Sequence, residues 1–110
     1  MMNNFEDINK GKTTAIVSYL TLIGTVIAIL MNNDTKSNFA SFHIRQALGI
    51  FLTFFLLGYF IGYFDSWMIT AAFWVFIFAL WGHGFMNALN GEEKEMPIVG
   101  KFYQDIFKSL

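Results

Sequence analysis

Three polar side chains, His43, Arg45 and Gln46, stand directly in front of a long apolar stretch of the chain. A second histidine, His83, and Asn87 lie near the end of the next apolar stretch. If the two stretches form an antiparallel hairpin, these polar groups lie at a similar depth near one end of it. Ionisable groups inside membrane segments often carry function, so a proton or ligand contact at His83 is one interpretation.

The simpler interpretation is a polar cap that holds helices together. His83 would then be a neutral imidazole hydrogen-bonded to Gln46 or to a backbone carbonyl. Arg45 would anchor the chain at the interface by reaching lipid phosphate or a neighbouring helix end. The same cap could also be a contact site for a partner protein.

Catalytic and metal chemistry are not indicated by these residue types. Two histidines without nearby acidic ligands do not form a convincing coordination set. The apolar stretches offer no nucleophile and no paired carboxylates, and the chain has no cysteine for a thiolate site. The net charge of −1 gives no electrostatic footprint for nucleic acid. We therefore expect a protein that is not an enzyme and that has no metal, no cofactor and no nucleic-acid partner.

The composition points to a lipid environment. Of 110 residues, 55% are apolar and 14% are charged, against a charged share of about 25% in soluble domains. A soluble domain of this size could not cover so much apolar surface. We expect the lipid bilayer to be the main partner of the chain.

Three apolar segments are long enough to cross a bilayer. We expect helices over about 14–31, 44–64 and 67–89 within one domain, 1–110, joined by a polar loop at 32–42 and a short turn at 65–66. Eighteen helical residues cover roughly 27 Å, close to the thickness of a hydrocarbon core. The alternative of a cleaved signal peptide is disfavoured, because the first run is too long and no cleavage pattern follows it. The predicted fold class is thus an all-α integral membrane protein with three transmembrane helices.

Small residues indicate where these helices touch, because close packing drives helix association in lipid. The candidate packing positions are Ser18, Thr21, Thr25, Gly58, Gly62, Gly82 and Gly84. Gly58 and Gly62 form a GxxxG pattern, which fits packing within the chain better than self-association.

The last residues show a separate, amphipathic pattern. Apolar positions recur at helical spacing after Pro97, at Phe102, Tyr103, Ile106 and Phe107 among others. A helix over 97–110 is too short to span a membrane, so we expect it to lie in the interface. A helix packed on a partner protein is the alternative.

Basic residues near the helix ends predict the orientation. With three spans, Lys10 and Lys12 lie on one side, and Lys36, Arg45, Lys94, Lys101 and Lys108 lie on the other. This asymmetry predicts an amino terminus outside the cell and a carboxyl terminus in the cytoplasm.

The polar block also resembles a known family pattern. Phe42-His43-x-Arg45-Gln46-Ala47, with Gly91, Pro97 and Gly100 further on, resembles small bacterial Tic20-like membrane proteins, often labelled import components. The resemblance implies a location in the bacterial inner membrane and a link to protein translocation. Its chloroplast members carry four spanning helices, where this sequence predicts three and a tail.

The expected function is that of a small accessory or structural subunit of a larger membrane assembly, in a setting of transport or protein translocation. Its partners would be the bilayer and other membrane proteins, or further copies of itself. The alternative is an oligomeric pore or a component of a protein-import channel.

Overall fold

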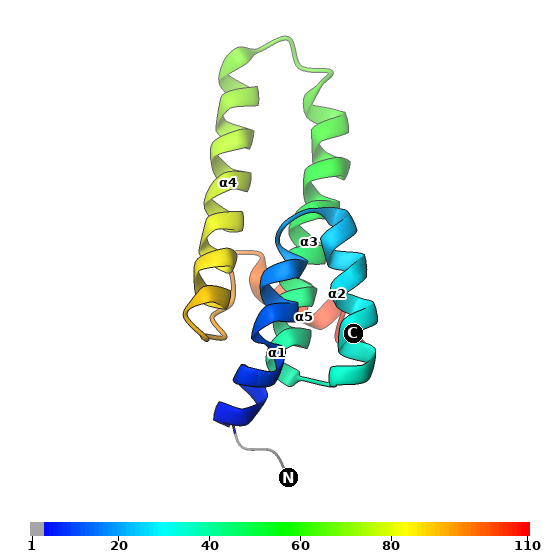
Figure 1. Ribbon diagram of the computed structural model, residues 1–110. Helices are drawn as coiled ribbons and strands as arrows, with labels where there is room; N and C mark the ends of the chain where they lie inside the picture. The colour runs from blue at the N-terminus through cyan, green and yellow to red at the C-terminus, as the bar shows by residue number, and fades with distance from the viewer. Residues whose placement is uncertain (1–3) are drawn as a thin grey trace.

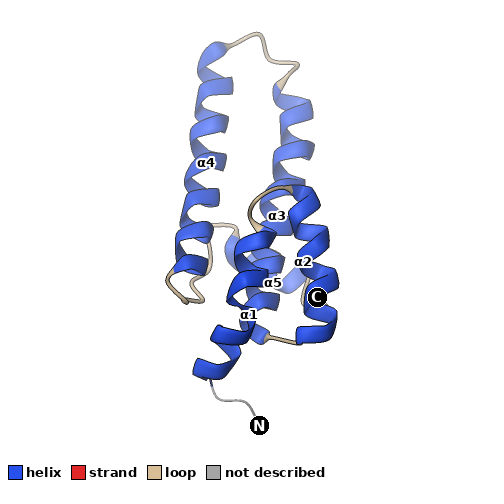
Figure 2. Ribbon diagram, viewed as in Figure 1, coloured by secondary structure: helices blue, strands red, loops and turns tan. Residues whose placement is uncertain are grey.

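The structure is a computed structural model that describes residues 4–110. Over that range the chain is helical without strands, and Figures 1 and 2 show the arrangement. The five helices are α1 (Asn4–Ser18), α2 (Leu22–Thr35), α3 (Asn38–Ile61), α4 (Trp67–Leu89) and α5 (Gly100–Ile106). The all-α prediction is confirmed.

The longest helices, α3 and α4, form an antiparallel hairpin. Ser66 caps α4 by accepting a hydrogen bond from the amide of Ile69. Both helices are long and apolar enough to cross a membrane, and only 28% and 22% of their apolar windows are buried inside the molecule. The apolar helix of a soluble core would be mostly buried, so these exposed faces fit a lipid environment.

The first predicted span, 14–31, is wrong as a single helix, and a third transmembrane helix is not confirmed. The chain turns at residues 19–21, and Thr21 begins α2 by accepting a hydrogen bond from the amide of Gly24 at 3.0 Å. Gly24 has no side chain to meet the Val17 carbonyl, which lies against it. The helices α1 and α2 therefore fold back on each other as a second, shorter hairpin (Figure 1).

Hydrogen bonds satisfy the backbone of this turn. The Thr25 hydroxyl donates to the carbonyl of Ser18 at 2.7 Å, and the Trp81 indole N–H donates to the carbonyl of Tyr19 at 2.6 Å. Irregular backbone is tolerated at membrane depth only where the protein itself supplies such partners. These bonds account for a turn inside a run that has neither proline nor charge.

The break in the first segment moves the start of the chain to the other end of the molecule. The Asp7 carboxylate accepts from the amides of Asn38 and Phe39 at 2.8 and 2.7 Å, so α1 begins beside the start of α3. The predicted polar loop at 32–42 shrinks to Lys36 and Ser37, because Ser37 caps α3 already at Asn38. The start of α1, the α2–α3 connection and α5 thus lie away from the α3–α4 turn, while the side of a membrane that each faces stays a prediction.

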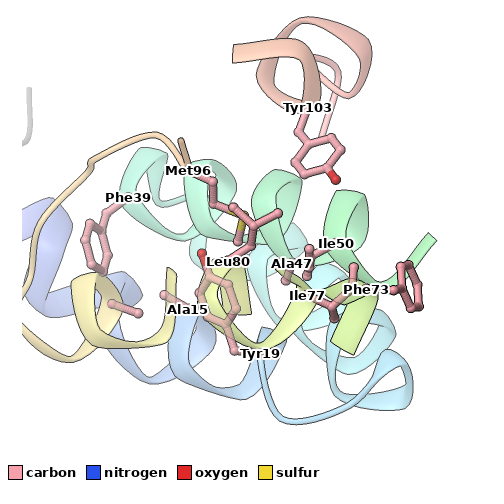
Figure 3. Close-up of a cluster of buried hydrophobic side chains, with 11 residues drawn as sticks. Ala15, Tyr19, Phe39, Ala47, Ile50, Phe73, Ile77, Leu80, Met96 and Tyr103 are labelled. Carbon is pink, nitrogen blue, oxygen red and sulfur yellow. The ribbon is translucent and has the colours of Figure 1, made fainter. Parts of the chain in front are cut away.

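The tail helix is shorter than predicted and is partly built into the core. Ile98 has a φ of 71°, which interrupts the helix expected from Pro97, and α5 covers only Gly100–Ile106. Its Tyr103 is 4% exposed and lies against Gly49 of α3. Figure 3 shows Tyr103 pointing from the tail toward the cluster around Ile50, Ala47 and Met96.

Candidate functional site

His43 connects two distant parts of the chain from a fully buried position, with 0% of its surface exposed. Its Nε2 lies 2.8 Å from the carbonyl oxygen of Glu92, and its Nδ1 lies 2.7 Å from the hydroxyl of Tyr19. A carbonyl can only accept, so Nε2 donates to Glu92, and in the neutral ring Nδ1 accepts from Tyr19. These two bonds therefore define the tautomer of the imidazole.

Gln46 lies one turn further along α3 and binds the same connecting segment. Its Nε2 donates to the carbonyl of Lys94 at 3.1 Å, and its Oε1 accepts from the amide of Met96 at 3.4 Å. One expectation paired Gln46 with His83, but Gln46 instead binds the backbone between α4 and α5. Residues three apart share a helix face, which is why His43 and Gln46 reach one segment.

Arg45 binds the end of the chain. Its guanidinium donates to the carbonyls of Phe107 and Lys108 at 3.1 and 2.8 Å, and to the Gln104 side chain at 3.3 Å. A cation that binds the last carbonyls of a helix is favourable because of the helix dipole. We call His43, Arg45 and Gln46 the polar clamp, because all three hold the chain after α4. A contact of Arg45 with lipid phosphate or a partner protein stays a prediction.

The polar clamp brings together two stretches that lie far apart in the sequence, 42–47 and 91–100. Gly100 lies where a Cβ would approach Gln46 Oε1 and the Glu95 backbone, and Gly91 has a φ of 71° that favours glycine. The glycines thus let the segment after α4 pass close over α3. The block that begins at Phe42 and the block that ends at Gly100 form one structural unit.

The side-chain hydrogen bond of His83 is formed within α4 and not with the polar clamp. Its nearest side-chain partner is Asn87, whose Nδ2 is 3.2 Å from Nδ1 of His83. Gly84 beside it accommodates Tyr19 and Met96 at close range, whereas Gly82 faces open space. A proton or ligand contact at His83 stays a prediction.

The other predicted packing residues have mixed surroundings. Ser18, Thr21 and Thr25 do not form one stripe, because they surround the turn between α1 and α2. A Cβ at Gly58 would be in ordinary contact with Phe73 at 3.7 Å, while one at Gly62 would meet only the backbone of its own helix end. In the tail, Phe102 and Ile106 are exposed and Pro97 precedes α5, while Phe107 packs on the core.

Two residues with important contacts were not identified from the sequence, Tyr19 and Asp7. Tyr19 is the only aromatic residue in the apolar run 14–31, and a buried tyrosine hydroxyl usually needs a partner, so this signal was available. Asp7 is buried and caps α3 through two amides 31 and 32 residues away, and nothing near it in sequence indicates this.

The buried polar groups of the site are paired in hydrogen bonds. Throughout 4–110, every buried side-chain nitrogen and oxygen has a hydrogen-bond partner. Within the same residues no group of three or more His, Asp or Glu side chains could hold a metal ion. Burial raises the pKa of Glu93, and the negative charge of Asp7 raises it further. The arrangement can fix helices and tail relative to one another.

Comparisons with known proteins correct the expected family. No curated protein and no solved structure matches the chain. A family model described as the magnetosome magnetite crystal formation protein family, MamF/MmsF, matches residues 10–103. The Tic20-like assignment is therefore wrong, and the block at 42–47 lies within the MamF/MmsF match. Because this match covers most of the 110 residues, the chain belongs to the MamF/MmsF magnetosome magnetite crystal formation family.

Proposed function

We propose that the protein is a small integral membrane protein that acts as a non-catalytic accessory subunit in magnetite crystal formation. The observation that carries the proposal is the family match over residues 10–103, which includes both membrane-length helices. The magnetosome family replaces transport and protein translocation as the setting in which the chain acts.

The contacts of the polar clamp support a structural role. Both ring nitrogens of His43 and both ends of the Gln46 amide are engaged within the chain. A general acid or base needs a free position within reach of a substrate proton. The clamp uses these groups to hold the segment 92–96 on α3.

The orientation we propose places both ends of the chain in the cytoplasm. With α1 and α2 as a hairpin, all seven basic residues lie toward one end of the molecule, and none lies in the α3–α4 turn at 62–66. They are Lys10, Lys12, Lys36, Arg45, Lys94, Lys101 and Lys108. Basic residues favour the cytoplasmic side, so the turn at 62–66 would face the opposite side of the membrane.

Fractionation and crystal measurements together test the proposal in a magnetite-forming host. Tagged protein should remain with membranes after alkaline carbonate extraction. Deletion of its gene should change the size or number of magnetite crystals seen by electron microscopy, and the parent gene should restore them. Release of the protein by carbonate, or unchanged crystals after deletion, would contradict the proposal.

A further inference from the structure

The molecule has very different widths at its two ends. The hairpin of α1 and α2 lies beside only one half of the α3–α4 pair, and α5 lies at that same half (Figure 1). We define the wide end as α1, α2, α5 and the adjoining halves of α3 and α4. The narrow end is the remainder of α3 and α4 with the turn at 62–66.

The position of the α1–α2 turn sets the length of the narrow end. The turn binds Trp81 through the carbonyl of Tyr19, and Trp67 begins α4 at the opposite end. At about 1.5 Å per residue, the 14 residues from Trp67 to Trp81 cover roughly 21 Å. Just beyond the turn, an apolar groove of about 330 Å³ opens between α3 and α4, lined by Leu20, Phe54 and Trp74 among others. No third helix covers the pair at this level in the described chain.

The outward face of α2 matches one leaflet in length. Ile23, Val26, Ile27 and Leu30 follow each other at helical spacing and are exposed, within the apolar part of α2 at 22–31. Ten residues of helix cover about 15 Å, which is half of a hydrocarbon core of about 30 Å. Polar residues follow at Asn32–Asp34, where this face would reach the headgroups. At its start this helix borders the apolar groove, where Leu22 lines the same surface as Phe54 and Trp74, so lipid is the natural cover of both.

The tail adds to the same leaflet. Phe102 and Ile106 are exposed on one side of α5, four residues apart, and Ile98 just before the helix is exposed as well, while Tyr103 and Phe107 pack inward. An amphipathic segment of this kind inserts its apolar side at the boundary of headgroups and acyl chains. One leaflet therefore holds four helices and this segment, whereas the other holds two helices.

We propose that the protein is a membrane wedge that binds preferentially to strongly curved bilayers, with its wide end in the convex leaflet. The convex leaflet is stretched at its surface, and inserted helices relieve the resulting packing defects. The inference rests on the membrane insertion proposed above, but it does not depend on any role in magnetite formation.

The test uses the full-length protein in giant vesicles of phosphatidylcholine and phosphatidylglycerol. Narrow tethers are pulled from vesicles in which protease protection has shown which end of the protein faces outward. Protein with its wide end outward should be enriched in the tether by about twofold or more over the flat membrane, because inserted amphipathic helices prefer loosely packed, convex leaflets. Protein in the reversed orientation should be depleted. Equal densities in tether and vesicle for both orientations would overturn the proposal.

A matched pair of variants tests the α2 face itself. Ile23→Asn with Leu30→Asn makes the face polar at two exposed positions and should abolish the enrichment. Ile23→Leu with Leu30→Ile keeps the face apolar and should preserve it. If the asparagine variant does not insert into the vesicles, the curvature preference is still tested by comparing the two orientations of the parent protein.

Two further outcomes distinguish the curvature preference from a failure of the proposed function and from a dimer interface on α2. Failure of the parent to insert at all would contradict the proposed function, whereas insertion without curvature preference would contradict only the wedge. If crosslinking showed the parent as a dimer through α2, and the asparagine variant became monomeric with its enrichment unchanged, a second copy rather than lipid would cover this face.

Discussion

At the scale of single residues, His43 shows how a buried polar group becomes part of a membrane protein's core. Its ring joins Tyr19, at the end of α1, to Glu92, after α4, and is packed edge-on by Phe39 and Phe42. Hydrogen bonds between helices in membranes contribute about 0.6 kcal/mol on average, but an unpaired group left behind costs more. We expect the His43 ring to contribute to stability mainly because its loss would leave the Tyr19 hydroxyl and the Glu92 carbonyl without a partner.

His43→Ala should therefore destabilise the fold, by about 1–3 kcal/mol for the buried polar group left without a partner. Tyr19→Phe removes the other partner of the same bond. The effects of the two changes should be less than additive in the double variant, because both break one interaction. Thermal melting in detergent measures all three variants, and strictly additive losses would contradict a direct bond.

Glu93 should make stability depend on pH. Burial, and then the charge of Asp7, raises the pKa of its carboxyl in the folded chain. The stabilising contribution of the protonated form is complete below the unfolded pKa, about 4.3, and is lost as pH rises through the raised pKa. Glu93→Gln should melt slightly above the parent at neutral pH, and the difference should vanish below about pH 4. Melting differences between the parent and Glu93→Gln that stay constant from about pH 4 to about pH 8 would contradict the raised pKa.

At the scale of elements, two glycines on the long helices have opposite surroundings. Gly49 lies under the ring of Tyr103, while Gly82 has open space around it. Gly49→Ala should displace α5 and cost about 1–3 kcal/mol through overpacking. Gly82→Ala should be neutral or stabilising by up to about 1 kcal/mol, because alanine favours the helix. Equal melting temperatures for the two variants would contradict the packing of Tyr103 on α3.

Arg45 should hold the end of the tail. Arg45→Gln removes the guanidinium that binds the carbonyls of Phe107 and Lys108. Limited proteolysis should then cut residues 104–110 faster, with α3 and α4 unaffected. As the control, Lys101→Gln removes an exposed charge from α5 itself and should leave the cleavage rate of residues 104–110 unchanged. Equal rates for the Arg45 variant and the parent would show that other contacts hold the tail.

The sequence predicted elements best where one local pattern dominates. Residues 67–89 were predicted with the observed bounds, because Asp65 and Ser66 mark the start and the apolar run marks the extent. The split of 14–31 was missed because no glycine, proline or charge stands at 19–21. The turn depends on Trp81, 62 residues away, and on Thr21 as a cap, which resembles any small residue in a membrane run. Similarly, α5 is short because Ile98 leaves the helical region of backbone conformation.

At the scale of the whole molecule, the α1–α2 hairpin leads to the proposed topology with both ends of the chain on one side of the membrane. Cysteines at Lys10, Thr35 and Ser109 should all be shielded from membrane-impermeant reagents in intact cells, while a cysteine at Ser66 should react. Lys10 decides between the two arrangements, because three spanning helices would expose it. Labelling at Lys10 with protection at Thr35 would contradict the α1–α2 hairpin.

The parts of the site were visible in the sequence, but their partners were not. His43, Arg45 and Gln46 were identified as one polar group at the start of a helix, and the structure places them on α3 near its start. The expected partners were lipid and neighbouring helices, since helix-end positions usually face those surroundings. Apart from the side chains of Tyr19 and Gln104, the observed partners are backbone carbonyls and an amide between residues 92 and 108, which have no side-chain signature.

The turn at Tyr19 also has a consequence for synthesis of the chain. Trp81, whose indole N–H donates to the carbonyl of Tyr19, leaves the ribosome 62 residues after Tyr19. Until then the turn has its local bonds from Thr21 and Thr25 but lacks this contact with α4, and α3 must already be inserted beside it. The first apolar segment to be made is thus the last to be fixed, and a nascent chain that stops before α4 should remain a substrate for membrane proteases.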